Sequence, residues 1–212
     1  PWNELKVSYR LPSDYLPYVR DFLDRYMDDD LKIDPELRQG DMEGVIETHM
    51  RWIQVRNEED SNAACVNAVL QFPLRKMRSD DNVTYPDIVV LAETIDSGKK
   101  IANKLGAQGI KVRHTFGLGS TDNKIIRRQK GAFFLGAEQV KATTIHSYKG
   151  WESTCLIVQL LDNATSNTVA AAYTALTRLK ASERGEDSYI TVVCSDPQFE
   201  DYGRTWPNFE HC

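Results

Sequence analysis

The sequence has no apolar run long enough to cross a membrane. Its longest stretches, such as residues 155–161 (CLIVQLL), fall far short of the roughly 20 residues that a bilayer requires. Neither end resembles a signal peptide. The 212 residues are 41% hydrophobic and 27% charged, which is ordinary for a soluble globular protein and argues against disorder. We therefore expect a folded protein without a membrane partner.

The sequence also has no CxxC pair and no histidine at metal-ligand spacing from a cysteine. We therefore expect neither a disulfide framework nor a metal site within the chain. Cys155 and Cys194 each lie in an apolar run, which is the usual setting of a reduced, buried thiol. This cysteine usage favours a cytoplasmic location.

A phosphate-binding loop of the form G-x-x-x-x-G-K-[ST] is absent as well. In the nearest approach, residues 93–100 (ETIDSGKK), Glu93 replaces the first glycine and Lys100 replaces the Ser or Thr. Residues 156–163 (LIVQLLDN) end in one acid and not in the Asp-Glu pair of a Walker B strand. The chain alone therefore offers no seat for Mg²⁺ or for a β-phosphate.

The sequence does contain alternating helix-like and strand-like segments. Helices are expected at 13–27, 59–77, 97–109 and 168–182; the first has a Ser13 cap and an apolar face of Tyr15, Val19, Phe22, Leu23 and Tyr26. Strands are expected at 5–10, 46–55, 87–93, 111–116, 140–145, 154–161 and 188–195, and the acidic stretch 28–41 is expected to be a loop. This alternation predicts an α/β fold with a mostly parallel sheet covered on both faces.

Parallel sheets of this kind bind ligands outside the carboxyl ends of their strands. The run 142–152 (ATTIHSYKGWE) begins inside the strand expected at 140–145 and continues beyond its end. We therefore expect this run to lie at the functional edge of the sheet.

Charge is distributed unevenly along the chain, whose net charge is −5. Residues 1–60 carry 8 basic and 15 acidic side chains, whereas residues 111–150 carry 8 basic and only 2 acidic ones. A charge run of this kind is most often a solvated face. Its position directly before and within the run 142–152 makes nucleic-acid phosphates an alternative partner.

The residue types after the strand at 140–145 suit phosphate oxygens. His146, Ser147, Lys149 and Gly150 offer an imidazole, a hydroxyl, an ammonium and exposed backbone N–H groups. Glu152 could accept hydrogen bonds from a ribose. A simple structural role remains open for His146 as an interfacial histidine, and a catalytic Ser-His pairing is disfavoured because adjacent residues leaving a strand point in opposite directions.

Arg178 is a single guanidinium on a helix of small and apolar residues. Its geometry suits a phosphoryl group whose charge grows in a transition state. The alternative that stays open is an ion pair with a nearby carboxylate.

Three motifs together resemble a known family. Residues 144–152 (TIHSYKGWE) and 173–178 (YTALTR) resemble motifs V and VI of superfamily 1 DNA helicases of the UvrD/Rep type, which run approximately T-[LI]-H-x-x-K-G-L-E and Y-V-A-x-T-R. Residues 7–12 (VSYRLP) are similar to that family's motif IV, N-Y-R-S. The motifs occur in the family's order and span nearly the whole chain; motif V is the specific one.

The resemblance implies a set of nucleotide contacts. Tyr9 would stack on adenine, and Arg10 would reach the γ-phosphate. Glu152 would bind the ribose, with Gly150 allowing close approach of the backbone. Arg178 would be the arginine finger, so that Arg10 and Arg178 are the implied catalytic residues.

It also implies nucleic-acid contacts. Thr144 and His146 would face the phosphates of single-stranded DNA, and Lys149 would lie between the DNA and nucleotide surfaces. Duplex DNA is a further implied partner.

The chain departs from the family pattern at three positions. Ser8 and Leu11 replace the Asn and Ser of motif IV but leave the Tyr-Arg pair intact. Trp151 stands where motif V has Leu. We expect Trp151 to pack into the edge of the core, with stacking on a base as the alternative.

The resemblance implies that residues 1–212 form a three-layer RecA-like domain without its own P-loop, the second of a two-domain motor and a fragment of a longer chain. The N-terminal RecA-like domain would hold most of the ATP and Mg²⁺ contacts, so the isolated fragment would be an inactive ATPase. Two alternatives stay open: a non-catalytic nucleic-acid-binding module of the same fold, and a superfamily 1 RNA helicase.

Overall fold

A computed structural model describes residues 11–27, 47–72, 87–117, 139–162, 168–182 and 186–212. Its centre is a seven-stranded sheet with the order β3-β4-β2-β5-β6-β1-β7, in which every described strand pair is parallel. The strands are β1 (Thr48–Gln54), β2 (Ile88–Ala92), β3 (Val112–His114), β4 (Val140–Thr144), β5 (Cys155–Leu160), β6 (Ser188–Cys194) and β7 (Phe209–His211). The predicted parallel α/β fold is confirmed.

The central strands are buried on both faces. Every residue of β2, β5 and β6 is buried, and for β5 the nearly continuous apolar run at 154–161 predicts this. The edge strands β3 and β7 have only three residues each, all of them half-buried or exposed. The core therefore follows the middle of the sheet.

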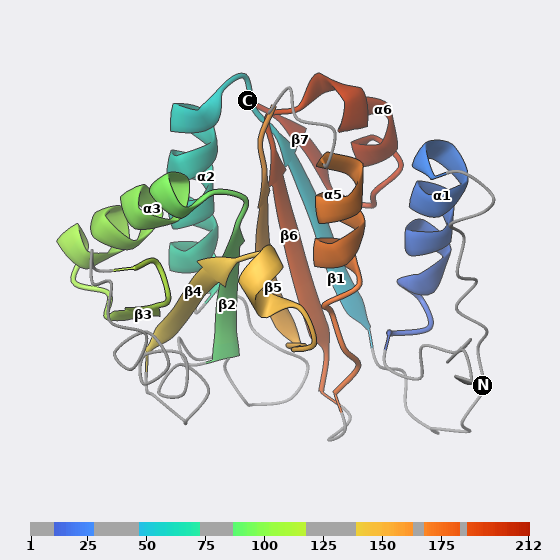
Figure 1. Ribbon diagram of the computed structural model, residues 1–212. Helices are drawn as coiled ribbons and strands as arrows, with labels where there is room; N and C mark the ends of the chain where they lie inside the picture. The colour runs from blue at the N-terminus through green and yellow to red at the C-terminus, as the bar shows by residue number, and fades with distance from the viewer. Residues whose placement is uncertain (1–10, 28–46, 73–86, 118–138, 163–167, 183–185) are drawn as a thin grey trace, which may run out of the picture.

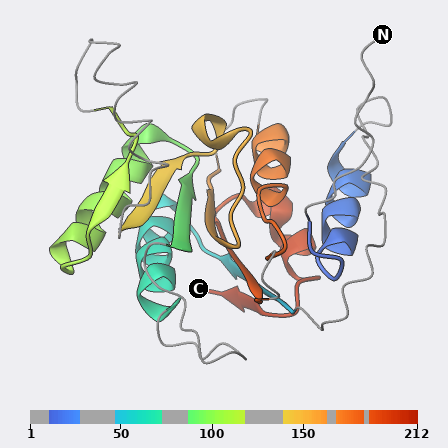
Figure 2. The ribbon, with the colours of Figure 1, turned by 90° about the horizontal axis from the view of Figure 1, so that it is seen from below.

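Helices cover both faces of the sheet, which gives three layers (Figure 1, Figure 2). The helices α2 (Glu58–Gln71) and α3 (Ile95–Ala107) pack on one face. The helices α1 (Leu16–Tyr26), α5 (Thr168–Leu176) and α6 (Glu200–Gly203) pack on the other, together with the short turns η4 (His146–Tyr148) and η5 (Pro197–Phe199). We refer to these as the α2 face and the α1 face.

The helix α1 buries most of the predicted apolar face but begins later than predicted. Tyr15, Val19, Phe22 and Leu23 are buried and Tyr26 is half-buried, whereas the predicted Ser13 cap is wrong. Ser13 lies in the preceding turn, where the Pro12 carbonyl accepts hydrogen bonds from the N–H groups of residues 15 and 16. The hydroxyl of Tyr15 donates to the Leu176 carbonyl (3.2 Å) and so ties α1 to α5.

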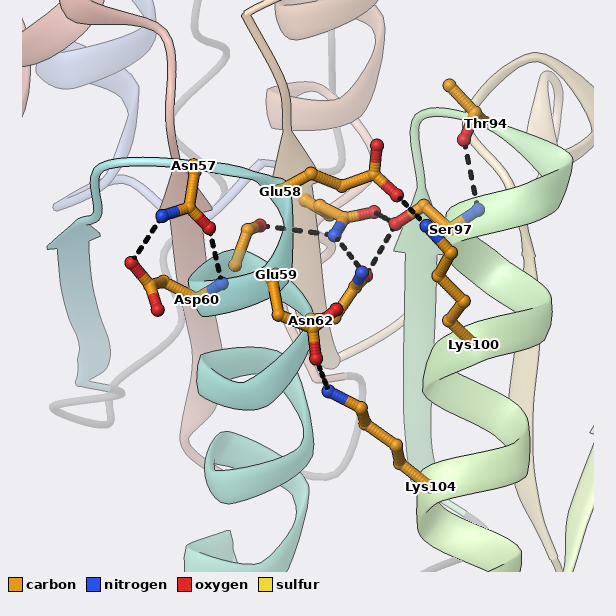
Figure 3. Close-up of polar contacts among 11 residues, drawn as sticks. Asn57, Glu58, Glu59, Asp60, Asn62, Thr94, Ser97, Lys100 and Lys104 are labelled. Atoms are coloured by element: carbon orange, nitrogen blue, oxygen red, sulfur yellow. Dashed lines mark hydrogen bonds and ion pairs between the residues drawn. The ribbon is translucent and has the colours of Figure 1, made fainter.

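The helices α2 and α3 start at side-chain caps and lie against each other over β5 (Figure 3). Asn57 accepts from the Asp60 N–H, and Thr94 accepts from the Ser97 N–H. Ser97 also contacts two buried amides, Asn62 and Gln159. Polar side chains therefore join two helices to a strand inside the α2 face.

The prediction of buried, reduced cysteines is confirmed, whereas three predicted segments are not tested. Cys155 and Cys194 are buried free thiols, and burial raises the pKa of both well above its usual value. The strand expected at 5–10, the loop expected at 28–41 and the last residues of the helix expected at 59–77 fall outside the described residues. In the described part of the chain, no helix is long and apolar enough to span a bilayer.

Candidate functional site

One segment, residues 144–153, connects the edge of the sheet at which the strands end (the carboxyl edge) to the edge at which they begin (the amino edge). It leaves β4 at the carboxyl edge, where the Ile145 N–H donates to the Ala92 carbonyl at the end of β2 (3.0 Å). It then crosses the α1 face, anchored by the buried side chains of Ile145 and Tyr148, and reaches the amino end of β5. The crossing includes the turn η4, which is drawn in gold near α5 in Figure 1 and Figure 2. We call it the crossing segment.

The carboxyl-edge end of the crossing segment presents Thr144, His146 and Ser147. The Thr144 hydroxyl accepts from the Ser147 N–H (3.2 Å) and donates to the Ser147 Oγ (3.0 Å), which caps the η4 turn. His146 and Ser147 are exposed. Thr144 thus holds the turn in which His146 and Ser147 are exposed.

The middle of the crossing segment is an exposed tip, residues 149–151. Gly150 has a φ of +90°, a conformation that favours glycine, and the Trp151 N–H donates to the Tyr148 carbonyl (3.0 Å). Trp151 is 47% exposed, so the prediction that it packs into the core edge is wrong. The buried place in this segment belongs to Tyr148, whose side chain is only 4% exposed.

The other end of the crossing segment lies beside the chain that follows α5. The Ser153 N–H donates to the Arg178 carbonyl, and the Lys180 N–H donates to the Ser153 carbonyl, both at 3.0 Å. The Ser153 hydroxyl also reaches the Asp87 carbonyl, just before β2 (3.3 Å). Glu152 and Arg178 are therefore neighbours at the amino edge of the sheet.

This placement corrects the expectation that the whole motif lies at the carboxyl edge. Of the side chains expected to bind a ligand, only Thr144, His146 and Ser147 lie there. A chain that ends one parallel strand and begins another must return to the amino edge, so Glu152 is carried to the opposite side. For the same reason α5, which follows β5, brings Arg178 to the amino edge at its far end.

Arg178 lies beyond the end of α5 and not on the helix as predicted. The helix ends at Leu176, and Arg178 is in the following turn. Its Nε donates to the Thr174 carbonyl and its Nη2 to the Thr177 Oγ1, both at 3.0 Å. The negative end of the helix dipole favours a cation at this position. A guanidinium has five N–H donors, so these two contacts leave others for a ligand.

Glu152 and Arg178 act electrostatically on the same buried phenol. Burial raises the pKa of Tyr148 well above its usual value; the Glu152 carboxylate acts in the same direction, and the Arg178 guanidinium opposes it. Burial likewise raises the pKa of Tyr173, again with Arg178 opposing. An acidic and a basic side chain, both half-buried, thus face one region at this edge.

Tyr9 and Arg10, the motif IV residues, lie outside the described residues. Sequence reasoning missed Tyr148, Ser153 and Thr177, which hold the others in place. Tyr148 could have been found as the one aromatic side chain in the crossing segment besides Trp151. No group of three metal-ligating side chains occurs within the ranges that the structure describes.

Comparison with solved structures identifies the fold. The C-terminal domain of a possible DNA helicase from Lactobacillus plantarum is similar to this chain, with a TM-score of 0.54 and 13% sequence identity over 97% of this chain and 99% of that one. The C-terminal domain of the DEAD-box protein Dbp5 matches with a TM-score of 0.49 and 12% identity over 79% of this chain and 91% of that one. No protein-family model matches the sequence, and no curated protein matches it. The chain therefore shares the parallel α/β fold of the first of these domains.

Proposed function

We propose that the chain is the C-terminal motor domain of an ATP-dependent superfamily 1 DNA helicase of the UvrD/Rep type. Residues 1–212 would be the second RecA-like domain of a longer protein whose first domain carries the P-loop. The observation that carries the proposal is the crossing segment. It joins the exposed Thr144-His146 edge to the edge where Glu152 lies beside Arg178.

On the amino edge, the proposed substrate is ATP held between the two domains. Arg178 would contact the γ-phosphate as the arginine finger, together with Arg10. Glu152 would accept from the ribose, and Tyr9 would stack on the adenine. The guanidinium of Arg178 acts most strongly on charge that develops in the transition state, so its main effect would be on turnover and less on ATP affinity.

On the carboxyl edge, the proposed ligand is the phosphate backbone of single-stranded DNA. His146 is exposed there and next to Ser147, whose hydroxyl accepts from Thr144 and so keeps its own hydrogen for a ligand. Lys149, exposed on the tip, would add a cation between the two surfaces. Closure of the domains on ATP would then move this edge along the strand.

Mg²⁺ would be held mainly by the proposed first domain; the residues that the structure describes include no group of three potential metal ligands. The sequence also lacks the P-loop Ser or Thr and the paired acids that hold the ion in such motors. The ion therefore belongs to the proposed first domain, and no step above depends on it.

The test is a pair of substitutions in the full-length protein. Arg178→Ala should lower DNA-stimulated ATP turnover on the order of 10³-fold while leaving single-stranded DNA affinity nearly unchanged. His146→Ala should weaken DNA affinity and the stimulation by DNA more than basal turnover. Turnover with and without DNA, and DNA affinity at a fixed salt concentration, measure both effects.

Each variant controls for the other, since they lie at opposite edges of the sheet. Near-wild-type turnover in Arg178→Ala, or loss of DNA affinity in place of turnover, would contradict the arginine-finger assignment and favour a non-catalytic binding module. Replacing DNA with RNA of the same sequence in the stimulation assay tests the strand preference: greater stimulation by RNA would indicate an RNA helicase.

A further inference from the structure

The tip of the crossing segment displays an aromatic ring that most proteins would bury. Among the described residues, the large apolar side chains left exposed are Ile95 (51%) and Trp151 (47%), whereas Trp52 and Trp206 are buried. Tryptophan is rarely this exposed, and its exposed part offers apolar aromatic surface that a ligand can cover.

The tip holds Trp151 in a defined position. On one side the Trp151 N–H is bonded to the carbonyl of Tyr148, whose side chain is buried in the core. On the other side, two residues further on, Ser153 is bonded through both backbone groups to the chain after α5. The ring is therefore presented from a segment anchored at both ends, which lowers the entropy cost of binding a ligand there.

The surroundings of the ring suit a planar, negatively charged ligand. Lys149, exposed on the same tip, supplies a cation two residues away. A Cβ placed on Gly150 would meet no atom within 4 Å, so the space beside the tip is open. Glu152, which directly follows the tip, is half-buried and acts on Tyr148. An exposed ring beside a cation is the combination that binds a base and its phosphate.

A protein partner fits this surface less well. The other exposed large apolar side chain, Ile95, begins α3 and so belongs to the α2 face of the sheet, whereas the tip lies on the α1 face. Among the described residues, the two large exposed apolar side chains therefore lie on different faces. Specific protein interfaces cover far more surface than one side chain offers.

We propose that Trp151 is a stacking platform for a nucleobase and that Lys149 contacts the phosphate attached to it. The proposal rests on the proposed function, since the base would come from ATP or from the bound strand. The stacking contact would be made at the position where motif V of UvrD/Rep-type helicases has Leu.

The test combines tryptophan fluorescence of the wild-type 212-residue chain with the affinities of the wild type and every variant, which isothermal titration calorimetry measures without needing Trp151. The probes are ADP, a single-stranded oligothymidylate, and an abasic oligonucleotide of the same length, which has the phosphates without the bases. We expect ADP or oligothymidylate to quench the wild-type chain. Trp151→Leu should weaken binding of that ligand roughly 5- to 100-fold, as loss of one stacked base does, and leave binding of the abasic strand unchanged.

Matched variants separate stacking from charge. Trp151→Phe should keep most of the affinity, and Lys149→Gln should weaken the abasic strand as well. An effect confined to ADP identifies the base as that of the mononucleotide, and an effect confined to oligothymidylate identifies it as that of the strand; both support the proposal.

The proposal is overturned if neither ligand quenches the wild-type chain, or if Trp151→Leu leaves both affinities unchanged, as a docking role for the ring would. An equal loss of abasic-strand binding in Trp151→Leu would also overturn it. None of these results alters the expected effects of Arg178→Ala and His146→Ala, so this proposal and the helicase assignment can fail separately.

Discussion

At position 150 of the crossing segment, the backbone conformation favours glycine, and crowding by neighbouring atoms plays no part. Its φ is +90°, yet an added Cβ would touch nothing within 4 Å. The helix residue Gly106 has the same free space, without a positive φ. The two positions therefore differ in backbone conformation but not in the space for a Cβ, so comparing them isolates the effect of conformation.

We predict opposite effects of the same substitution at these two glycines. Gly150→Ala should lower the free energy of unfolding by about 1–2 kcal/mol, because an L-residue is strained at this φ. Gly106→Ala should raise it by about 0.5–1 kcal/mol, because alanine loses less entropy in a helix. Urea denaturation of both variants measures the difference. Equal changes in the two would show that the tip relaxes its backbone at little cost.

At the scale of elements, a buried polar cluster joins α2, α3 and β5 (Figure 3). The Ser97 Oγ lies 2.6 Å from both the Asn62 Oδ1 and the Gln159 Oε1, and all three residues are fully buried. One hydroxyl hydrogen cannot serve two acceptors, so one of the amides must turn an NH₂ group toward Ser97. Ser97 thereby satisfies two buried groups at once.

We predict that this cluster contributes more to stability than the ion pairs on the surface of the same helices. Ser97→Ala should cost about 1–3 kcal/mol, since it leaves at least one buried amide without a partner. Lys100→Met removes the Lys100–Glu58 pair, whose two side chains are 53% and 45% exposed, and should change stability much less. Thermal or urea unfolding measures the loss of stability in each variant. An equal loss in the two would contradict the prediction.

The elements themselves could be predicted where the pattern is local. The apolar run of β5 and the periodic face of α1 each appear in the sequence and in the structure. The end of α5 could not be predicted, because its small residues continue the helical pattern past Leu176. What ends the helix is pairing of Arg178 and Lys180 with Ser153, which is distant in the sequence.

The candidate site could be predicted in its residues but not in its geometry. The run 144–152 indicates phosphate chemistry from residue types alone. Its division between the two edges depends on the order β4-β2-β5, since the chain must cross a neighbouring strand to begin β5. The exposure of Trp151 follows from the same crossing, because Tyr148 already occupies the buried position.

At the scale of the whole molecule, the crossing segment gives the proposed motor a direct connection between its ligands. A DNA strand at the carboxyl edge and ATP at the amino edge would contact the two ends of one segment of about ten residues, 144–153. Tyr148 fixes the middle of that segment in the core. A displacement of either end is therefore constrained by the same buried side chain.

The last prediction concerns the 212-residue chain by itself, which should hydrolyse no ATP above background. Arg178 can stabilise charge on a γ-phosphate only if the phosphates are held in place, and the sequence has no G-x-x-x-x-G-K-[ST] loop to hold them. Turnover is measured for the purified chain and for Arg178→Ala prepared in the same way. Activity that is equal in both comes from a contaminating ATPase and leaves the prediction standing. Activity that is lost in Arg178→Ala would show that the chain is a complete catalyst, and the two-domain motor would be wrong.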